Sequence, residues 1–420
     1  MTAAPTPADE TAILAQAPVT SLPRVWLGLL RKRLSEGELG AIPVVLGLLL
    51  IAIVFQTANS HFLTPVNLTN LMVQIAAIGT IAVGVVFVLL LGQIDLSVGW
   101  ASGLCAAVLA VLNVHYGVPA VLAVILALLA GTAIGLFQGT WFTKLHVPAF
   151  VVTLAGYIGL QGALLYVLGS TGTINLNDAF IGDIANRLVP VALGWIIAAA
   201  LVGAFAVASL RTYWRRTRSG LLVGPFVGVV FRIVVVGAGV AAAVAIMSVD
   251  RSSSVIPIQG VPTGVLIFIA VVIGADLLVQ RTRFGRDILA VGGNLEAARR
   301  AGLNVDRLRI AVFALTSTLA ALGGILAASR LFAVNQSSGG GDVLLNSIAA
   351  AVIGGTSLFG GRGRPRNALL GALVIGSIAN GMDLLALSSA VKFMITGGVL
   401  LLAVSIDAAS RRGREAAGRA

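Results

Sequence analysis

Charged residues are scarce in this sequence of 420 residues, of which only 10% are Asp, Glu, Lys or Arg. Soluble domains carry roughly 25% charged residues. Hydrophobic residues make up 58% of the chain, and a water-soluble fold would leave many of them exposed because folding buries only part of a chain's surface. The composition therefore excludes an ordinary soluble protein and makes lipid the solvent for most of the chain.

The sequence also lacks the residues on which several kinds of chemistry depend. Its single cysteine, Cys105, excludes a disulfide within the chain, and its three histidines are scattered without metal-ligand spacing. It contains no Walker-type nucleotide loop, no H-E-x-x-H zinc motif and no recognisable Ser–His–Asp set. We therefore expect neither an enzyme nor a cofactor or metal site.

Acidic residues are nearly absent from the interior of the apolar runs, where ion-coupled carriers usually need carboxylates. The two candidates, Asp276 and Asp383, lie close to the ends of such runs. Since the chain has neither a nucleotide motif nor an evident ion site, a transporter with this sequence would take its energy from a partner protein.

Long apolar runs predict an all-α, polytopic bundle of about twelve transmembrane helices, because a helix needs ~20 apolar residues to cross a bilayer core. We expect a disordered cytoplasmic N-terminus over 1–40, a transmembrane domain over 41–408 and a basic cytoplasmic tail over 409–420. No cleavage site follows the first run, which should remain as an uncleaved anchor. The expected spans are 41–57, 68–91, 97–114, 118–140, 147–169, 189–210, 233–249, 262–280, 308–331, 343–358, 367–386 and 391–408.

Basic residues cluster at the ends of these runs and account for the net charge of +12. Clusters in such places indicate cytoplasmic loops, whereas a nucleic-acid surface would place them on one face among stacking aromatics. With an even number of spans and both termini in the cytoplasm, every cluster faces inward, so we expect membrane lipid and no nucleic acid as a partner. The clusters are 24–33, 211–218, 281–309, 362–366 and 411–419.

One run has two interpretations. Leu221–Met247 forms either one span with Arg232 near its centre, at a cost of roughly 2.5–3.5 kcal/mol, or two parts. We favour the second, in which Arg232 lies at the cytoplasmic interface, Ile233–Val249 spans and Leu221–Phe231 lies along the inner surface.

A second pattern concerns helix packing. Gly131, Gly135 and Gly139 form a stripe of small residues on one helix face, which allows a neighbouring backbone to approach closely. We favour packing within the chain over a dimer face.

The stretch 281–309 is the only long polar segment in the C-terminal half, and we interpret 281–307 as a loop that a second protein can grip. Asn294 is a suitable N-cap for a short helix over Leu295–Ala301, and Gly302 suits the left-handed position after it. Glu296 in the first turn complements the helix dipole. The alternative is an ordinary capped loop helix beneath the bundle.

This loop resembles the coupling loop of monosaccharide permeases of ATP-binding-cassette importers. The resemblance is carried by FGR at 284–286, AVGGN at 290–294, AAR at 297–299 and GLNV at 302–305. Further motifs of that family match IDLSVG at 94–99, VPAFVVTLAG at 147–156 and IAAAVIGGTSLFGG at 348–361. The additional apolar segment at 189–249 and the C-terminal stretch are similar to the D-xylose branch, whereas ribose-type members have a ten-span plan.

The resemblance implies a homodimeric inner-membrane subunit that carries a pentose, most simply D-xylose, for a sugar-binding protein outside and cytoplasmic ATPases inside. The residues implied to contact the ATPase are Arg286, Asn294, Glu296, Ala297, Ala298 and Gly302. Three alternatives stay open: another sugar such as ribose, galactose or arabinose, an ion-coupled secondary carrier, and a membrane scaffold or sensor that transports nothing.

Four polar residues are candidates for gating or for the translocation path. Asp95 and Ser97 are expected to cap the third span on its cytoplasmic side, with a gate or partner contact as the sharper interpretation. Asn380 and Asp383 lie near an outer span end, where they could meet sugar hydroxyls or form hydrogen bonds between helices. Gln93 and the stretch 344–346 depart from the family pattern because they lack its acidic residues.

Overall fold

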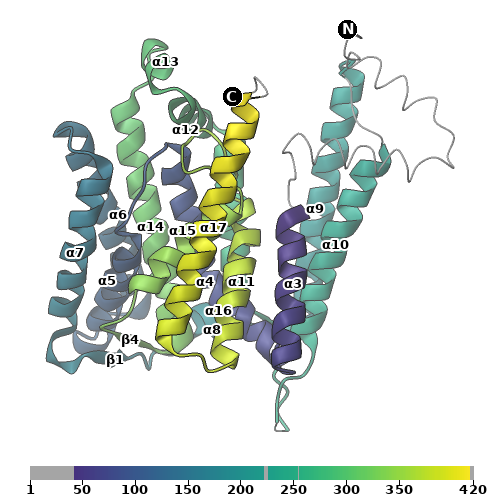
Figure 1. The fold of residues 1–420 in the computed structure, drawn as a ribbon. Helices are drawn as coiled ribbons and strands as arrows, with labels where there is room; N and C mark the ends of the chain where they lie inside the picture. The colour runs from purple at the N-terminus through teal and green to yellow at the C-terminus, as the bar shows by residue number, and fades with distance from the viewer. Residues whose placement is uncertain (1–41, 222–225, 254, 417–420) are drawn as a thin grey trace.

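The computed structural model describes residues 42–221, 226–253 and 255–416, and these form a bundle of roughly parallel and antiparallel helices (Figure 1). Nine helices are long and apolar enough to cross a membrane by length and composition, and three shorter apolar helices accompany them in this part of the chain. The all-α prediction is confirmed. The apolar helices are α3 Ile42–Ala58, α4 Pro65–Leu90, α5 Val98–Ala110, α6 Ala120–Lys144, α7 Ala149–Leu168, α9 Val191–Arg218, α10 Phe226–Ser248, α11 Thr263–Arg281, α14 Val305–Leu331, α15 Gly341–Ile353, α16 Asn367–Leu384 and α17 Ser389–Ala416.

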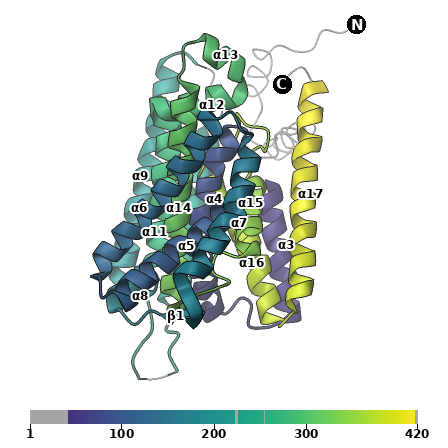
Figure 2. The same cartoon turned by 90° about the vertical axis from the view of Figure 1, so that its left-hand side faces the viewer.

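Helices α4 and α14 form the centre of the bundle. In its most apolar stretch α4 is 89% buried, which means that protein rather than lipid surrounds it on all sides. Helix α14 packs against α4, α5 and α6, and Figure 2 shows this group from a second side. The main core cluster draws its side chains from both central helices, including Phe87 and Phe313.

The glycine stripe of α6 faces α14, as the within-chain interpretation predicted. A methyl group on Gly131 would lie 2.6 Å from the Cβ of Ala321, and one on Gly135 would lie 2.3 Å from the carbonyl oxygen of Phe313. Both distances are shorter than any real carbon contact, so glycine is required for this close helix approach.

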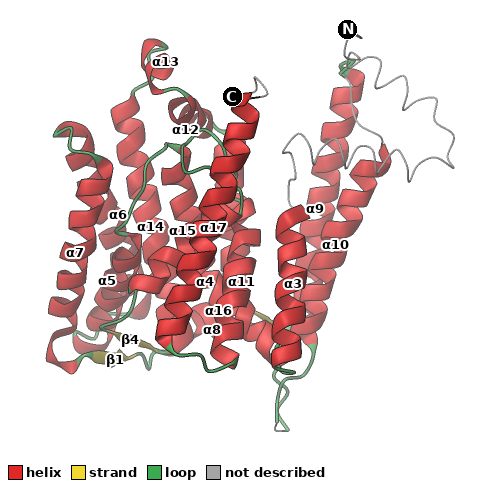
Figure 3. Cartoon of the chain, in the orientation of Figure 1, coloured by secondary structure: helices red, strands yellow, loops and turns green. Residues whose placement is uncertain are grey.

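The end of the bundle away from α13 carries the few strands (Figure 3). Strand β1, Thr173–Asn175, pairs antiparallel with β4, Ala333–Asn335. Strand β2, Leu188–Val189, pairs with β3, Val261–Pro262. Between the strands β1 and β2 lies the short helix α8, Ala179–Asn186, and together these elements tie distant loops to one another.

Helices α9 and α10 form a hairpin at the edge of the bundle (Figure 1). Only 11% and 6% of their most apolar stretches are buried, so lipid would cover most of their surface. Helix α10 begins at Phe226 and runs through Arg232 without a break, which corrects the expectation that Leu221–Phe231 forms a separate surface segment. Of that segment, 222–225 lies outside the described residues.

Candidate functional site

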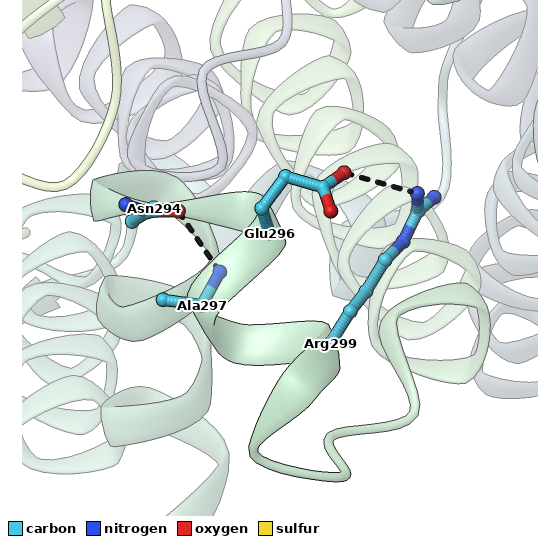
Figure 4. Close-up of polar contacts among 4 residues, drawn as sticks. All are labelled: Asn294, Glu296, Ala297 and Arg299. Carbon is cyan, nitrogen blue, oxygen red and sulfur yellow. Dashed lines mark hydrogen bonds and ion pairs between the residues drawn. The ribbon is translucent and has the colours of Figure 1, made fainter.

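The polar loop after α11 folds into two short helices that end in a projecting turn. Helix α12 spans Arg283–Gly293, and helix α13 spans Leu295–Arg300. Asn294 separates them in an extended conformation (φ −153°, ψ 100°), and its Oδ1 accepts a hydrogen bond from the backbone N–H of Ala297 at 2.9 Å (Figure 4). The predicted N-cap is therefore present.

The other end of α13 closes with two hydrogen bonds that satisfy its last carbonyl groups. The N–H of Gly302 donates to Arg299 at 2.9 Å, and the N–H of Leu303 donates to Ala298 at 3.2 Å. This pair of bonds is the Schellman arrangement, which needs a residue with positive φ. Gly302 supplies that conformation with φ +81°, so the sequence specifies both ends of a helix only six residues long.

The two faces of α13 differ. Ala298 is buried against the core cluster, whereas Glu296 and Ala297 are exposed. The Glu296 carboxylate lies 3.7 Å from the guanidinium of Arg299, and both side chains are at least half exposed (Figure 4). An ion pair of this kind contributes little to stability because water screens it. The outer face therefore remains available to a partner.

Helix α12 anchors α13 to the bundle through backbone contacts. A Cβ atom on Gly292 would lie 1.7 Å from the carbonyl oxygen of Leu90, the last residue of α4, and 2.7 Å from the backbone nitrogen of Gly361. That nitrogen donates a hydrogen bond to the same Leu90 oxygen at 2.9 Å. We call this three-way contact of Gly292, Leu90 and Gly361 the glycine junction. It joins the loop helices to α4 and to the α15–α16 loop.

The start of α12 is fixed in a similar way. The Thr282 hydroxyl caps the helix by accepting a hydrogen bond from the N–H of Gly285 at 3.2 Å. Gly285 lies against the backbone of Val279 in α11, with no room for a side chain. Arg286 lies in the first turn of α12 and is exposed, so it is available to a partner at the surface rather than packed in the core.

Asp95 and Ser97 form a buried polar cluster just before α5. The Ser97 backbone N–H and hydroxyl both donate to Asp95 Oδ1, at 2.8 and 2.6 Å, and Gln138 Nε2 of α6 donates to the Ser97 hydroxyl at 2.9 Å. Ser97 occupies the predicted N-cap position, but its side chain makes no capping bond, because Asp95 holds the hydroxyl instead. The predicted N-cap position of Ser97 is therefore confirmed, but the predicted capping hydrogen bond from its side chain is absent.

The second oxygen of Asp95 has no hydrogen-bond partner in the described part of the chain, and the residue is 3% exposed. Burial raises the pKa of this carboxyl, and the hydrogen bonds from Ser97 oppose the rise only in part. The site therefore favours a neutral group over a carboxylate.

The remaining two candidates lie near the opposite end of α4. Asn380 and Asn67 exchange two side-chain hydrogen bonds, at 2.7 and 3.0 Å, and both are buried. Asp383 forms an ion pair with Lys392 of α17 at 2.5 Å and is exposed. Because Asn67 lies in the first turns of α4 and Asp95 follows its last turn, the structure does not bring the four path candidates together.

Three parts of these sites were not identified from the sequence: Gln138, which bonds to Ser97, Asn67, which bonds to Asn380, and the glycine junction. Gln138 could have been found as a lone amide within an apolar run, since such groups need a partner in a membrane. Asn67 stood just before an expected span. The junction carried no signal, because its glycines are distant in sequence and only the fold brings them together.

Comparison with known proteins gives independent evidence about the family of this chain. The model of the family described as branched-chain amino acid transport system / permease component matches residues 67–404. The xylose transport system permease protein XylH of Escherichia coli (strain K12) is 38% identical over 85% of this chain and 88% of its own length. XylH of Haemophilus influenzae is 33% identical over 84% and 92%, and the ribose import permease protein RbsC of Escherichia coli (strain K12) is 34% identical over 86% and 91%. No solved structure matches the chain.

Proposed function

This chain belongs to the branched-chain amino acid transport system / permease component family of multi-pass membrane proteins, and from that membership we propose that it is the membrane-spanning subunit of an ATP-binding-cassette importer for a monosaccharide. The curated relatives that support this are a xylose permease and a ribose permease. Hydrolysis of ATP would take place in a partner subunit, because the chain has no nucleotide loop.

The observation that carries the proposal is the position of α13. Its exposed face, with Glu296 and Ala297, projects from one end of the bundle (Figure 1). A groove on an ATPase would receive this short helix. At Gly292, α12 touches the backbone of α4 directly, with no side chain between them. A displacement of α13 would therefore move α4 as well, because no flexible side chain can absorb the movement. The ATPase would change the transporter by binding two states with different free energies.

We propose D-xylose as the sugar. The identity of 38% to the xylose permease of Escherichia coli, against 34% to the ribose permease, supports this. The resemblance of the additional segment 189–249, which forms α9 and α10, to the D-xylose branch also supports it. Uptake measured with xylose, ribose, galactose and arabinose in competition tests this choice. A preference for ribose would leave the import proposal standing and replace the sugar.

A sugar-binding protein would dock at the end opposite α13. A pocket at that end is lined by amide and carboxylate side chains of the β1–α8 region, including Asn175, Asp178 and Asp183, and such groups suit hydrogen bonds with sugar hydroxyls or with a polar partner surface. A second copy of the chain would complete the translocation path for the sugar, because the family that the sequence resembles forms homodimers.

The decisive experiment uses the chain reconstituted in vesicles with its ATPase and binding protein. Glu296→Lys combined with Ala297→Trp should leave the protein in the membrane and uncouple ATP hydrolysis from uptake, so that hydrolysis no longer drives sugar into the vesicles. Arg216→Gln, an exposed change at the end of α9 and outside the 281–307 loop, serves as the control and should transport normally. Normal transport by the double variant would refute the role of α13.

The same vesicles separate the rival functions. Uptake that collapses with the proton gradient and ignores ATP depletion would indicate a secondary carrier. Failure of the complete system to move any sugar would indicate a scaffold or sensor.

A further inference from the structure

A pocket lies at the end of the bundle opposite α13, where β1, α8 and the end of α14 come together (Figure 1). Its volume is about 590 Å³, and sites for small molecules typically measure ~300–1,000 Å³. Leu331 and Phe332, at the end of α14, form one wall, and the segment from β1 to α8 forms the rest. Because α14 is one of the two central helices, the pocket adjoins the centre of the bundle.

Several polar side chains of the pocket have unused hydrogen-bonding capacity. Asn175, Asn177 and Asp183 are exposed, and in the described part of the chain their side chains form no hydrogen bond or ion pair. The side-chain Nδ2 of Asn186 donates to two backbone carbonyl oxygens, at 3.1 and 2.8 Å, which leaves its Oδ1 as an acceptor. The pocket thus offers both donors and acceptors, and a hydroxyl group can use both.

The pocket carries little free charge. Asp178 is its second acidic residue, and Oδ1 of this side chain caps α8 by accepting hydrogen bonds from the backbone N–H groups of Phe180 and Ile181, at 2.9 and 3.4 Å. Its Oδ2 accepts a longer bond of 3.5 Å from Asn113 Nδ2. Asp183 is therefore the one carboxylate of the lining that lacks a partner among the described residues, and neutral amides surround it. Such a mixture suits an uncharged polyhydroxyl ligand better than a basic side chain, which binds most strongly to free carboxylates.

The aromatic ring of Phe332 supplies an apolar wall. This residue has φ +53° and ψ 22°, a left-handed conformation that is unfavourable for a bulky side chain. Its carbonyl oxygen accepts a hydrogen bond from the N–H of Leu176 at 2.8 Å, and its ring packs on Gly182, where an added Cβ would lie 2.6 Å from the ring. The residue is nevertheless 49% exposed. Glycine would end α14 here without strain, so the backbone does not explain the ring, and strained residues often lie at functional sites.

We propose that this pocket binds a monosaccharide, with the C–H face of the sugar ring on Phe332 and the sugar hydroxyls bonded to Asp183, Asn175 and Asn177. An apolar wall with a few polar groups that fix orientation is the usual form of a small-molecule site. The inference rests on the proposed function for the nature of the cargo, and it adds where this chain holds it. The pocket would keep the sugar at the end of α14 between its release from the binding protein and its entry into the translocation path. Because the polar groups are exposed to competing water, the binding should be weak.

The test measures the binding of D-xylose to the purified full chain in detergent, without the ATPase or the binding protein, by saturation-transfer difference NMR. The wild type should bind D-xylose equally at low and high salt, because the ligand is neutral. Xylitol has hydroxyl groups but no ring face, and it should bind more weakly. L-arginine, a probe for a basic side chain of a partner, should not compete.

Two variants of the pocket test its two walls. Phe332→Gly removes the ring and relieves the strain, and it should weaken D-xylose binding roughly 2- to 12-fold. Its matched control is Ala386→Gly, which makes the same change at another residue of positive φ outside the pocket and should leave binding unchanged. Asp183→Asn should weaken binding by a similar factor, whereas Arg187→Gln, an exposed change beside the pocket, should not. The Asp183 arm keeps the proposal testable if Phe332→Gly does not fold.

Three outcomes would overturn the sugar site: no D-xylose signal from the wild type, equal binding by the wild type and both pocket variants, or salt-sensitive binding of L-arginine in place of the sugar. The last would make the pocket a socket for a basic side chain of the binding protein. ATP-driven uptake by the reconstituted vesicles is a separate readout. Uptake without binding to the chain alone would refute this site and keep the importer, whereas binding without any uptake would keep the site and refute the importer.

Discussion

Substituting alanine for Gly292 should disrupt the contact between the loop helices and the centre of the bundle. The added Cβ would lie 1.7 Å from the Leu90 carbonyl oxygen, whereas real contacts of this kind stay beyond 3.0 Å. The α12 backbone would have to move by more than 1 Å, and it would push against the hydrogen bond from Gly361 to Leu90.

The magnitude follows from two costs. Overpacking of a tight contact costs typically 1–3 kcal/mol, and weakening one backbone hydrogen bond costs roughly 0.5–1.5 kcal/mol. We therefore expect Gly292→Ala to lower the free energy of unfolding by about 2–4 kcal/mol. Denaturant unfolding of the purified protein in detergent measures this change.

The next residue provides the control. Gly293 is in the same helix, and a Cβ there meets nothing within 4 Å. Gly293→Ala should leave stability unchanged or raise it by up to about 1 kcal/mol, because alanine favours helix more than glycine. In reconstituted vesicles, Gly292→Ala should also move less sugar per ATP hydrolysed, while Gly293→Ala should not. Equal stability and equal transport for the two variants would refute the glycine junction as the mechanical link.

Other substitutions test the local structure. Asn294→Ala should remove the cap on Ala297 and cost about 1 kcal/mol, visible as faster hydrogen exchange confined to α13, whereas Asn294→Asp should retain protection. The pKa of Asp95 is higher in the folded protein than in the unfolded chain, where it is near 3.8. The protonated Asp95 therefore stabilises the fold fully below that unfolded pKa, and this stabilisation is lost as the pH rises through the folded pKa. Thermal unfolding of Asp95→Asn should therefore show a weaker loss of stability between acidic and neutral pH than the wild type does, and an identical loss would contradict the assignment. Asn380→Ala should destabilise by about 1–3 kcal/mol by removing the donor to the buried Oδ1 of Asn67, and the double change with Asn67→Ala should cost less than the sum of the two single changes.

Much of this structure follows from local sequence signals. Apolar length predicted the positions of the helices, and the residue types at Asn294 and Gly302 predicted both ends of α13, because caps depend on neighbours a few residues away. The contact made by the glycine stripe of α6 could also be predicted from the sequence, since the four-residue spacing places the glycines on one helix face.

The rest depended on contacts between distant segments. The glycine junction joins residues of α4, α12 and the α15–α16 loop, and no local pattern says which of the 50 glycines meet. Ser97 was expected to cap α5, but Asp95 two residues earlier competes for its hydroxyl, and short polar side chains often bond locally in this way. The continuous start of α10 was missed because the cost of Arg232 was judged without its contact to Phe205.

The close approach of α6 and α14 limits how this protein can move. Where Gly131 and Gly135 meet the facing main chain, there is no layer of side chains to change rotamers as one helix slides past the other. Tightly packed contacts of this kind switch between discrete arrangements or stay fixed. The two helices should consequently travel as one rigid unit, and any alternation between inward and outward openings must take place along other boundaries of the bundle.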